Sequence, residues 1–481
     1  MGARAVGRVA LTVVGLLLLA AIGAARQPAA RPDLLVIIAD DWSWPDAAAA
    51  GHPVIRTPAF DRVAREGVLF RHAFAAAPSC SASRAALLTG QAPHRLGEGA
   101  NLWSRLRPEF VTYPDRLEQA GYTIGLVGKG WGPGTLDGTG RTRNPAGPPV
   151  ESFEAFLERL PADSAFAFWI GPSDPHRPYE PGLAGRSGLS SAAQRVPETL
   201  PDVPAVRQDL ADYAAEVERF DGTVAAALAT LEARGRLDRT LVVVTSDNGR
   251  PFPRDKANLY DGGTRVPLAI RWPARIRAGR VVDAFVSLTD LAPTMLAAAG
   301  LAPDPAMTGQ SLIALFNGEP QRDRDRVYVE RERHAQVRAG NLGYPSRGVR
   351  TKDHLYIRNF APERWPAGDP TMREAVGPFG DVDHGPAKDF ILAYRDDPAI
   401  APFYARAFAR RPAEELYALA TDPDQLINVV DREEHRPALA SLRASLAAWM
   451  RDTGDPRATG GEDVFSGYPY FGPATPWPGG R

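Results

Sequence analysis

The chain has 481 residues, which at about 150 residues for each domain favours two or three units, or one large α/β unit with a smaller companion. Hydrophobic residues make up 44% and charged residues 23%, close to globular averages. Because 56 Lys and Arg residues nearly balance 57 Asp and Glu residues, the composition argues against a whole-protein attraction to nucleic acid or acidic membranes and leaves only a local basic cleft open. The single cysteine excludes an intrachain disulfide and a cysteine-based zinc site.

The N-terminus has the three parts of a secretory signal. Arg4 and Arg8 precede an apolar run over residues 9–22, and small residues follow up to Ala25. This order predicts a signal peptide over residues 1–25. An uncleaved anchor is the weaker alternative, because the run is shorter than the ~20 residues that a spanning helix needs. We therefore expect an exported protein, periplasmic or secreted, with no membrane association in its mature form.

Continuous apolar runs alternate with helical patterns through the first half of the chain. Such runs are typical of buried parallel strands, and each one ends in a polar cluster. The alternation predicts an α/β fold with a doubly wound, mostly parallel sheet and helices on both faces. The apolar runs occupy residues 34–39, 122–127, 165–170 and 241–245, and the helical patterns residues 58–66, 85–88 and 210–233.

The polar clusters at the ends of these runs indicate a shared site. Ligands of open parallel sheets lie beyond the carboxyl ends of the strands, so the clusters are expected to converge on one crevice. Each cluster alone is also explained as an ordinary turn. The clusters are Asp40-Asp41, Gly128-Lys129, the run from Gly171 to His176, and Ser246-Asp247-Asn248-Gly249.

The pattern changes beyond about residue 340. Alternating residues, a short strand-like piece and a final helix predict a smaller α+β domain with an antiparallel sheet. We therefore divide the chain into a catalytic domain over residues 31–340 and a smaller C-terminal domain with a tail over residues 341–481. The alternating stretch covers residues 348–358, the strand-like piece 415–417 and the helix 436–450; the tail from Gly454 is expected to pack irregularly over the surface or to be partly mobile.

The lone cysteine, Cys80, leads into a predicted helix with Arg84 four residues further on. At this spacing the two side chains share a helix face. The arginine and the positive helix N-terminus are expected to stabilise anionic character at position 80. The alternative is a small buried cysteine at a helix start.

The run Cys80-Ser81-Ala82-Ser83-Arg84, followed by Ala86-Leu87-Leu88-Thr89-Gly90, resembles the signature of the type I sulfatases of the alkaline-phosphatase-like superfamily. In that family the cysteine is oxidised after translation to Cα-formylglycine. The resemblance implies a large alkaline-phosphatase-like domain with a sheet between helices. The polar clusters match other family blocks in the same order, as do Leu291-Ala292-Pro293-Thr294 and Thr308-Gly309-Gln310-Ser311-Leu312.

Within this family three stretches are similar to the heparan N-sulfatases, or sulfamidases. They cover residues 174–177, 246–260 and 344–349. The resemblance implies hydrolysis of N-sulfoglucosamine residues of heparin or heparan sulfate. Alternatives are an O-sulfatase acting on glycan or aryl sulfate esters, a phosphodiesterase or phosphonate hydrolase of the same superfamily, and an inactive glycan-binding pseudo-sulfatase.

A metal site is predicted from ligand type. Asp40, Asp41, Asp247 and Asn248 all offer oxygen donors, which suit a hard cation, and the modified Cys80 would add another oxygen. A thiol is a poor calcium ligand, so the unmodified residue would complete the shell badly. The resemblance implies one Ca²⁺ for each chain, and Mg²⁺ stays an alternative.

Sulfate transfer needs a nucleophile at sulfur, cations for the sulfonate oxygens and a proton for the leaving group. The resemblance implies that hydrated formylglycine supplies two hydroxyls, one that attacks sulfur and one that drives sulfate elimination. The expected roles are Cys80 as the modified nucleophile, Arg84 as its hydrogen-bond donor, Lys129 and Lys256 as sulfonate cations, His176 as the acid, and Arg177 and His354 as substrate-binding residues.

The chain departs from the family pattern after the lysine. Relatives carry a histidine two residues later that helps to deprotonate the second hydroxyl, whereas this chain has Trp131. Either another histidine takes the role, or a different base acts, or activity is impaired. The candidate histidines are His94, which more simply braces its loop, His354 and His384.

The resemblance also implies partners. A formylglycine-generating maturation enzyme is expected to modify Cys80, and Ala82, where proline is commoner, leaves open which system acts. The expected substrate is a sulfated glycan. No nucleic-acid partner is expected, and a homodimer stays an open alternative.

Overall fold

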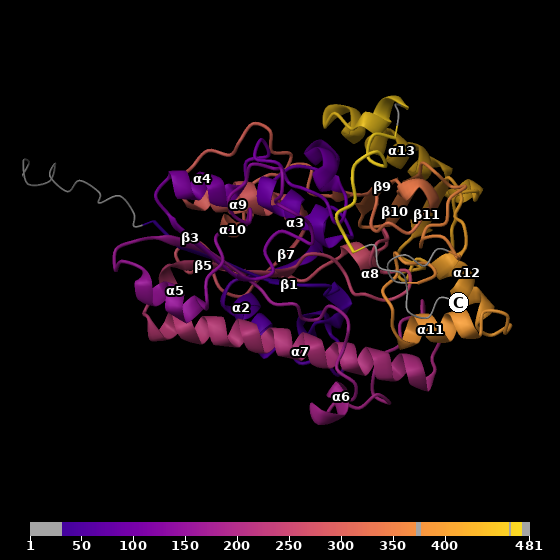
Figure 1. The fold of residues 1–481 in the computed structure, drawn as a ribbon, viewed down its shortest axis with the longest axis horizontal. Coiled ribbons are helices and arrows are strands. Elements are labelled where there is room, and N and C mark those ends of the chain that lie inside the picture. The colour runs from indigo at the N-terminus through magenta and orange to yellow at the C-terminus, as the bar shows by residue number, and fades with distance from the viewer. Residues whose placement is uncertain (1–30, 372–376, 461–462, 474–481) are drawn as a thin grey trace, which may run out of the picture.

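The structure is a computed structural model that describes residues 31–371, 377–460 and 463–473. It forms a larger unit around one sheet and a smaller unit around a second sheet (Figure 1). The predicted signal peptide lies outside the described residues. Among the described helices, none combines the length and the apolar character needed to cross a membrane.

The larger unit contains a seven-stranded sheet in the order β3-β4-β1-β5-β6-β2-β7. The first four strands are parallel to one another, β6 is antiparallel to both of its neighbours, and β2 and β7 are parallel. The prediction of a mostly parallel sheet is therefore confirmed, and its four predicted strands lie side by side. The strands are β1 (Asp33–Ala39), β2 (Val68–Phe74), β3 (Thr123–Gly128), β4 (Phe166–Gly171), β5 (Thr240–Ser246), β6 (Leu268–Arg271) and β7 (Arg280–Ser287).

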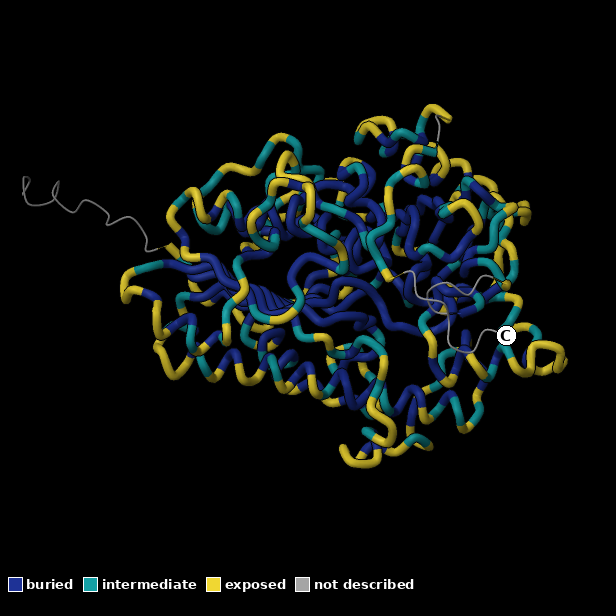
Figure 2. Tube along the Cα trace, in the orientation of Figure 1, coloured by how far each residue is buried: buried dark blue, intermediate teal, exposed yellow. Residues whose placement is uncertain are grey.

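Helices cover both faces of this sheet, as β1 illustrates. Leu35 and Ile37 face a layer that contains α2, α5 and α7, whereas Leu34 and Val36 face a layer that contains α3, α4, α9 and α10. The long helix α7 runs along one face of the molecule (Figure 1), and the strands between the layers are buried (Figure 2). The helices are α2 (Pro58–Glu66), α3 (Cys80–Thr89), α4 (Tyr113–Gln119), α5 (Phe153–Arg159), α6 (Leu183–Arg186), α7 (Pro204–Ala233), α8 (Asp261–Thr264), α9 (Leu291–Ala298) and α10 (Ile313–Asn317).

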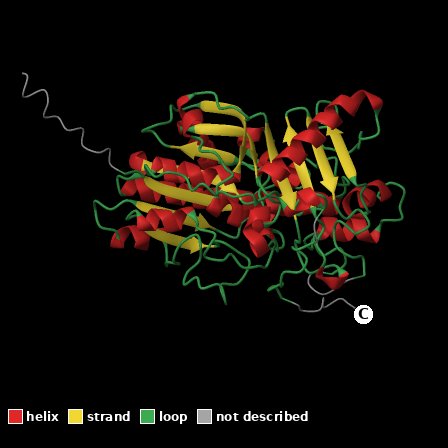
Figure 3. Cartoon of the chain, turned by 90° about the horizontal axis from the view of Figure 1, so that it is seen from above, coloured by secondary structure: helices red, strands yellow, loops and turns green. Residues whose placement is uncertain are grey.

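The smaller unit contains an antiparallel sheet in the order β11-β10-β9-β8 (Figure 3). The alternating stretch predicted as one strand is a hairpin, because the chain turns between β9 and β10. The sheet begins with β8, ahead of the boundary predicted at residue 340. The elements are β8 (Arg326–Arg331), β9 (Ser346–Thr351), β10 (His354–Asn359), β11 (Glu414–Ala418), α11 (Pro386–Ala393), α12 (Ala401–Phe408) and α13 (Arg436–Asp452).

The smaller sheet lies between α13 and the larger unit. Val349 and Leu416 pack against leucines of α13, whereas Val329 and Leu355 pack against side chains of the larger unit that include Phe74. Because both faces are buried, the smaller unit is fixed against the larger one, and the loops that follow β8 are held beside the carboxyl ends of the parallel strands.

Candidate active site

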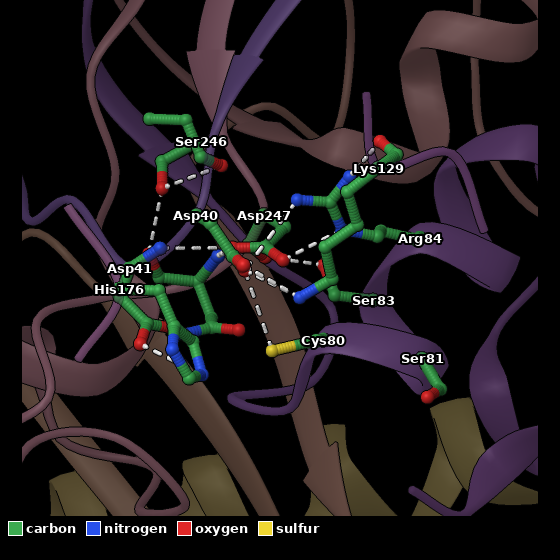
Figure 4. A network of polar contacts seen from close by, with 12 residues as sticks. Asp40, Asp41, Cys80, Ser81, Ser83, Arg84, Lys129, His176, Ser246 and Asp247 are labelled. Atoms are coloured by element: carbon green, nitrogen blue, oxygen red, sulfur yellow. Dashed lines mark hydrogen bonds and ion pairs between the residues drawn. The ribbon is translucent and has the colours of Figure 1, made fainter. Parts of the chain in front are cut away.

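The predicted polar clusters meet at one cavity. It has a volume of about 340 Å³ and lies at the carboxyl ends of the parallel strands, beside the N-terminus of α3 (Figure 4). Five residues singled out in the sequence line it: Asp40, Cys80, Lys129, His176 and Lys256.

Cys80 is the first residue of α3 and is buried. Its Sγ lies 3.6 Å from Oδ1 of Asp40, as Figure 4 shows. Burial raises the pKa of the thiol well above its ordinary value, and the charges of Lys129 and Lys256 do not offset this effect. The predicted anionic character at position 80 is therefore wrong for the unmodified side chain. A thiol in this environment is protonated and a weak nucleophile.

Arg84 is fully buried, and its guanidinium contacts the buried carboxylates of the site. Its Nε donates to Oδ2 of Asp247 over 2.7 Å, and its Nη2 lies 3.5 Å from Oδ1 of Asp40. Nη1 donates to the carbonyl oxygens of Lys129 and Gly130 over 2.9 and 3.0 Å. The guanidinium thus ties α3 to the ends of three strands, β1, β3 and β5.

Two lysines neutralise the paired aspartates that follow β1. Nζ of Lys129 lies 2.6 and 2.8 Å from the two carboxylate oxygens of Asp40. Nζ of Lys256 lies 2.7 Å from Oδ2 of Asp41 and 3.1 Å from Oδ2 of Asp383. Burial acts to raise the pKa of Asp40, but nearby positive charge, Lys129 foremost, outweighs it and holds that pKa well below its ordinary value.

The residues at this point fit a hard divalent cation. Ligand atoms of Asp40, Asp41, Cys80 and Asp247 all lie within 4.8 Å of one another. Oδ1 of Asn248 is buried and has no hydrogen-bond partner, whereas its Nδ2 donates to Oδ1 of Asp41 over 2.7 Å. An unpaired buried carbonyl oxygen beside three carboxylates is a ligand set of the kind that Ca²⁺ or Mg²⁺ takes.

Asp41 itself adopts a backbone conformation that non-glycine residues rarely take. Its φ is 80°. Such strain in a non-glycine residue persists where surrounding contacts fix it, and it is frequent at functional sites. Here the contacts are Lys256 and Asn248, which fix the side chain among the other carboxylates.

His176 lines the cavity, and its contacts define the roles of its two ring nitrogens. Its Nδ1 donates to the carbonyl oxygen of Arg177 over 2.5 Å, and its Nε2 lies 3.8 Å from Oδ2 of Asp41. A carbonyl oxygen can only accept, so Nδ1 carries a proton and Nε2 is the nitrogen that exchanges one with the cavity. Asp41 and Asp383 place negative charge beside it.

The predicted substrate-binding role of Arg177 is not supported. Its Nη1 and Nη2 donate to the carboxylate of Asp209 over 2.7 and 2.9 Å, and its Nε donates to the carbonyl oxygen of Pro251. The guanidinium also lies over the rings of Tyr179 and Phe252. Every nitrogen is used internally, and the residue does not line the cavity.

His354 does not line the cavity either. It is the first residue of β10, an inner strand of the smaller sheet, and its ring contacts that of His435 at a centroid distance of 5.9 Å. The cavity lining does not support the predicted contact with substrate, which stays a prediction.

Neither of the other two candidate histidines lines the cavity. Nδ1 of His94 lies 2.9 Å from Oε2 of Glu330, a contact that fits the structural role of bracing its loop. Nε2 of His384 lies 3.1 Å from Oδ2 of Asp389.

Several cavity residues carried no signal in the sequence. His334 is buried, lines the cavity, and places Nδ1 2.9 Å from Oγ of Ser79, the residue before Cys80. Asp383 also lines the cavity. His334 lies in the loop after β8 and Asp383 in the segment before α11, and neither belongs to the parallel strand ends from which the site was predicted. Other cavity residues that were missed are Leu102, Trp103, Pro133, Ala335, Gly380, Tyr470 and Pro473.

Trp131, at the position where the resemblance implies a histidine, is buried in the same apolar core cluster as Leu126. It does not line the cavity. The space near position 80 is instead reached by His334, from the smaller unit.

Comparison with known proteins identifies the family of this chain. A model of the sulfatase family matches residues 32–136 and 150–301. A model described as the C-terminal part of N-sulphoglucosamine sulphohydrolase matches residues 252–369. The chain is 30% identical to N-sulphoglucosamine sulphohydrolase of Homo sapiens, over 89% of this chain and 91% of the human protein.

Solved structures agree on the fold. A protein crystallised with its substrate D-glucosamine-2-N,6-O-disulfate superposes with a TM-score of 0.63 at 20% identity, over 90% of this chain and 100% of that one. A phosphonate monoester hydrolase of Agrobacterium radiobacter superposes with a TM-score of 0.66 at 18% identity, over 88% and 96%. The family model spans more than half of the chain, and the human relative spans nearly all of it. The chain is a hydrolase that belongs to the sulfatase family.

Proposed function

We propose that this protein is an exported, calcium-dependent sulfatase that removes the N-sulfate of glucosamine at the ends of heparin or heparan sulfate chains. The observation that carries the proposal is the similarity to the human sulfohydrolase, which extends over nearly the whole chain and not only over the catalytic unit. The match to the C-terminal model adds support, because that region supplies His334 and overlaps Lys256.

The nucleophile in this proposal is Cys80 after conversion to formylglycine by a maturation enzyme. The hydrated aldehyde supplies an oxygen nucleophile that the thiol cannot match, because burial keeps the thiol protonated. A calcium ion held by Asp40, Asp41, Asp247 and Asn248 would polarise the bound sulfonate.

Lys129 and Lys256 neutralise the negative charge of the sulfonate oxygens. Both are paired with carboxylates of the proposed metal site, Lys129 with Asp40 and Lys256 with Asp41. A divalent cation held by those carboxylates would share their negative charge, which would leave both ammonium groups available to substrate. Positive charge fixed in a buried site stabilises the transition state without costly reorganisation.

His176 is the proton donor for the leaving amine. Nδ1 is committed to the carbonyl oxygen of Arg177, so the proton that leaves the imidazolium comes from Nε2. The side chain is about one third exposed, which allows proton exchange with solvent.

His334 is our candidate for the role of the histidine that Trp131 replaces. It lines the cavity beside position 80, and its contact with Ser79 fixes the ring at the start of α3. Burial lowers its pKa to about 4, so near neutral pH the ring is uncharged and able to accept a proton.

Replacing His334 by glutamine is expected to lower steady-state sulfate release by about a hundredfold, because proton transfer by a positioned base contributes about that much. Amine release in the first turnover should stay fast, which produces a burst. Rapid quenching with separate assays of amine and sulfate measures both steps. His354→Gln is the control, since His354 lies outside the cavity; a His334→Gln enzyme with the kinetics of this control would exclude the role.

Substrate choice tests the proposed function directly. The matured protein should release sulfate from N-sulfoglucosamine and, at least about tenfold less efficiently, from 6-O-sulfoglucosamine, because its similarity to the human N-sulphoglucosamine sulphohydrolase extends over nearly the whole chain. Ion chromatography of released sulfate measures both rates. Release from the O-sulfated sugar alone would assign the enzyme to the O-sulfatases, and faster turnover of an aryl phosphodiester than of either sugar would assign it to phosphorus chemistry.

A further inference from the structure

The C-terminal tail, residues 463–473, returns from α13 to the larger unit, where it appears as the yellow segment of Figure 1. Tyr470 and Pro473 line the same cavity as Cys80. The sequence predicts irregular packing over the surface or partial mobility for the tail. The described part of the tail is instead one wall of the active site.

Backbone contacts hold the first part of the tail. Asn101 donates from Nδ2 to the carbonyl oxygen of Phe465 over 2.9 Å, and its Oδ1 accepts from the backbone N–H of Arg333. The guanidinium of Arg333 donates to the carbonyl oxygens of Tyr468 and Pro469 over 2.7 and 2.8 Å. Since Arg333 directly precedes His334, the residue that clamps the tail and a residue of the cavity are neighbours in the chain.

The second part of the tail is held beside Trp103. The backbone N–H of Phe471 donates to the carbonyl oxygen of Trp103 over 2.8 Å, and Arg105 lies 4.6 Å from the Phe471 ring centroid. A Cβ at Gly472 would lie 2.5 Å from the Tyr470 ring and 2.7 Å from the Trp103 ring. The two aromatic rings therefore close around a residue that has no side chain.

These contacts give the cavity two different sides. Lys129 and Lys256 form a charged floor beside Cys80, and Trp103 and Tyr470 contribute aromatic surface to the wall. The volume of about 340 Å³ is near the lower end of the ~300–1,000 Å³ usual for small-molecule sites. Such a cavity suits one sugar ring with its sulfo group on the floor.

We infer that the tail determines substrate specificity, with Tyr470 and Trp103 binding the ring of the sugar that carries the sulfo group. The apolar faces of a sugar ring pack against aromatic side chains, which are rigid and lose little conformational entropy on binding. The inference rests on the proposed function, because it assumes a sulfated sugar as substrate.

Substitution of Tyr470 by alanine tests the inference. The KM for N-sulfoglucosamine should rise about tenfold, with a much smaller change in kcat, because the ring contacts the sugar in the ground state and in the transition state alike. Competitive inhibition by inorganic sulfate should be unchanged, because sulfate needs only the charged floor. Tyr468→Ala is the matched control, since it removes the same side chain from the tail outside the cavity.

Gly472→Val provides a second variant that keeps both aromatic rings and forces them apart, and it should raise KM in the same way. Melting temperatures verify that each variant is folded. Equal KM values for Tyr470→Ala and Tyr468→Ala would overturn the inference, as would a parallel loss of sulfate inhibition. A wild-type enzyme inactive on N-sulfoglucosamine would contradict the proposed function instead, and the same comparison on the sulfated sugar that it does hydrolyse would still test the wall.

Discussion

Replacing Cys80 by alanine is expected to abolish sulfate release, with a fall in kcat of at least about a thousandfold, because the covalent route is lost. The side chain is buried but small, and its sulfur contacts Oδ1 of Asp40 over 3.6 Å. The variant should therefore stay folded, with a loss of stability of about 1 kcal/mol or less. Sulfate release and the thermal unfolding midpoint measure the two effects.

The Cys80→Ser variant tests the role of the oxygen nucleophile separately from the role of the second hydroxyl. A serine offers one hydroxyl at nearly the same place but cannot expel sulfate by forming an aldehyde, so at most a single turnover is expected. Mass spectrometry of the peptide that carries position 80 checks the premise, since conversion to the aldehyde lowers the mass by about 18 Da. Full activity in Cys80→Ala, or an active enzyme that keeps its thiol, would contradict the proposed nucleophile.

Removal of the divalent cation is expected to have the next largest effect. Treatment with EGTA should lower turnover at least about a hundredfold, because the sulfonate loses a Lewis acid. The unfolding midpoint should fall by several degrees and not collapse, because binding to the folded state adds stability by mass action. We expect the protein to stay folded because Arg84, Lys129 and Lys256 form ion pairs with the same carboxylates.

Asp247→Asn supplies the matched variant for this experiment. It keeps the shape of the side chain and removes one ligand charge, so the difference in unfolding midpoint between calcium-loaded and EGTA-treated protein should shrink. Adding back Ca²⁺ or Mg²⁺ to the wild type distinguishes the two ions. If EGTA changed neither the unfolding midpoint nor the turnover, a calcium site among these carboxylates would be ruled out.

The floor of the active site could be predicted from the sequence because it is built from local features. Asp40 follows β1, Lys129 follows β3, and Asp247 follows β5. In a parallel sheet the carboxyl ends of neighbouring strands meet at one edge, so residues placed there by local pattern converge without knowledge of the detailed packing. The same reasoning placed Cys80 at the start of a helix.

The errors and omissions share a different cause. Arg177 was assigned to substrate, but Asp209 of α7 uses its guanidinium, and no local pattern relates these two positions. The prediction for His354 is a place at the rim, but its ring contacts that of His435 and it does not line the cavity. Side-chain direction and pairing depend on what packs opposite, which short-range periodicity does not encode.

By itself, therefore, the sequence determined four neighbouring parallel strands, the α/β arrangement, the helix start at Cys80 and the oxygen-rich cluster, since each follows from strand ends and helix starts. Only the tertiary structure decided which groups complete the cavity. His334, Asp383 and Tyr470 come from loops and from the tail, and contacts between distant segments, such as those of Ser79 and Arg333, hold two of them in place. Such long-range contacts form only after the two units have packed together, and their energy comes from partners that are remote in sequence.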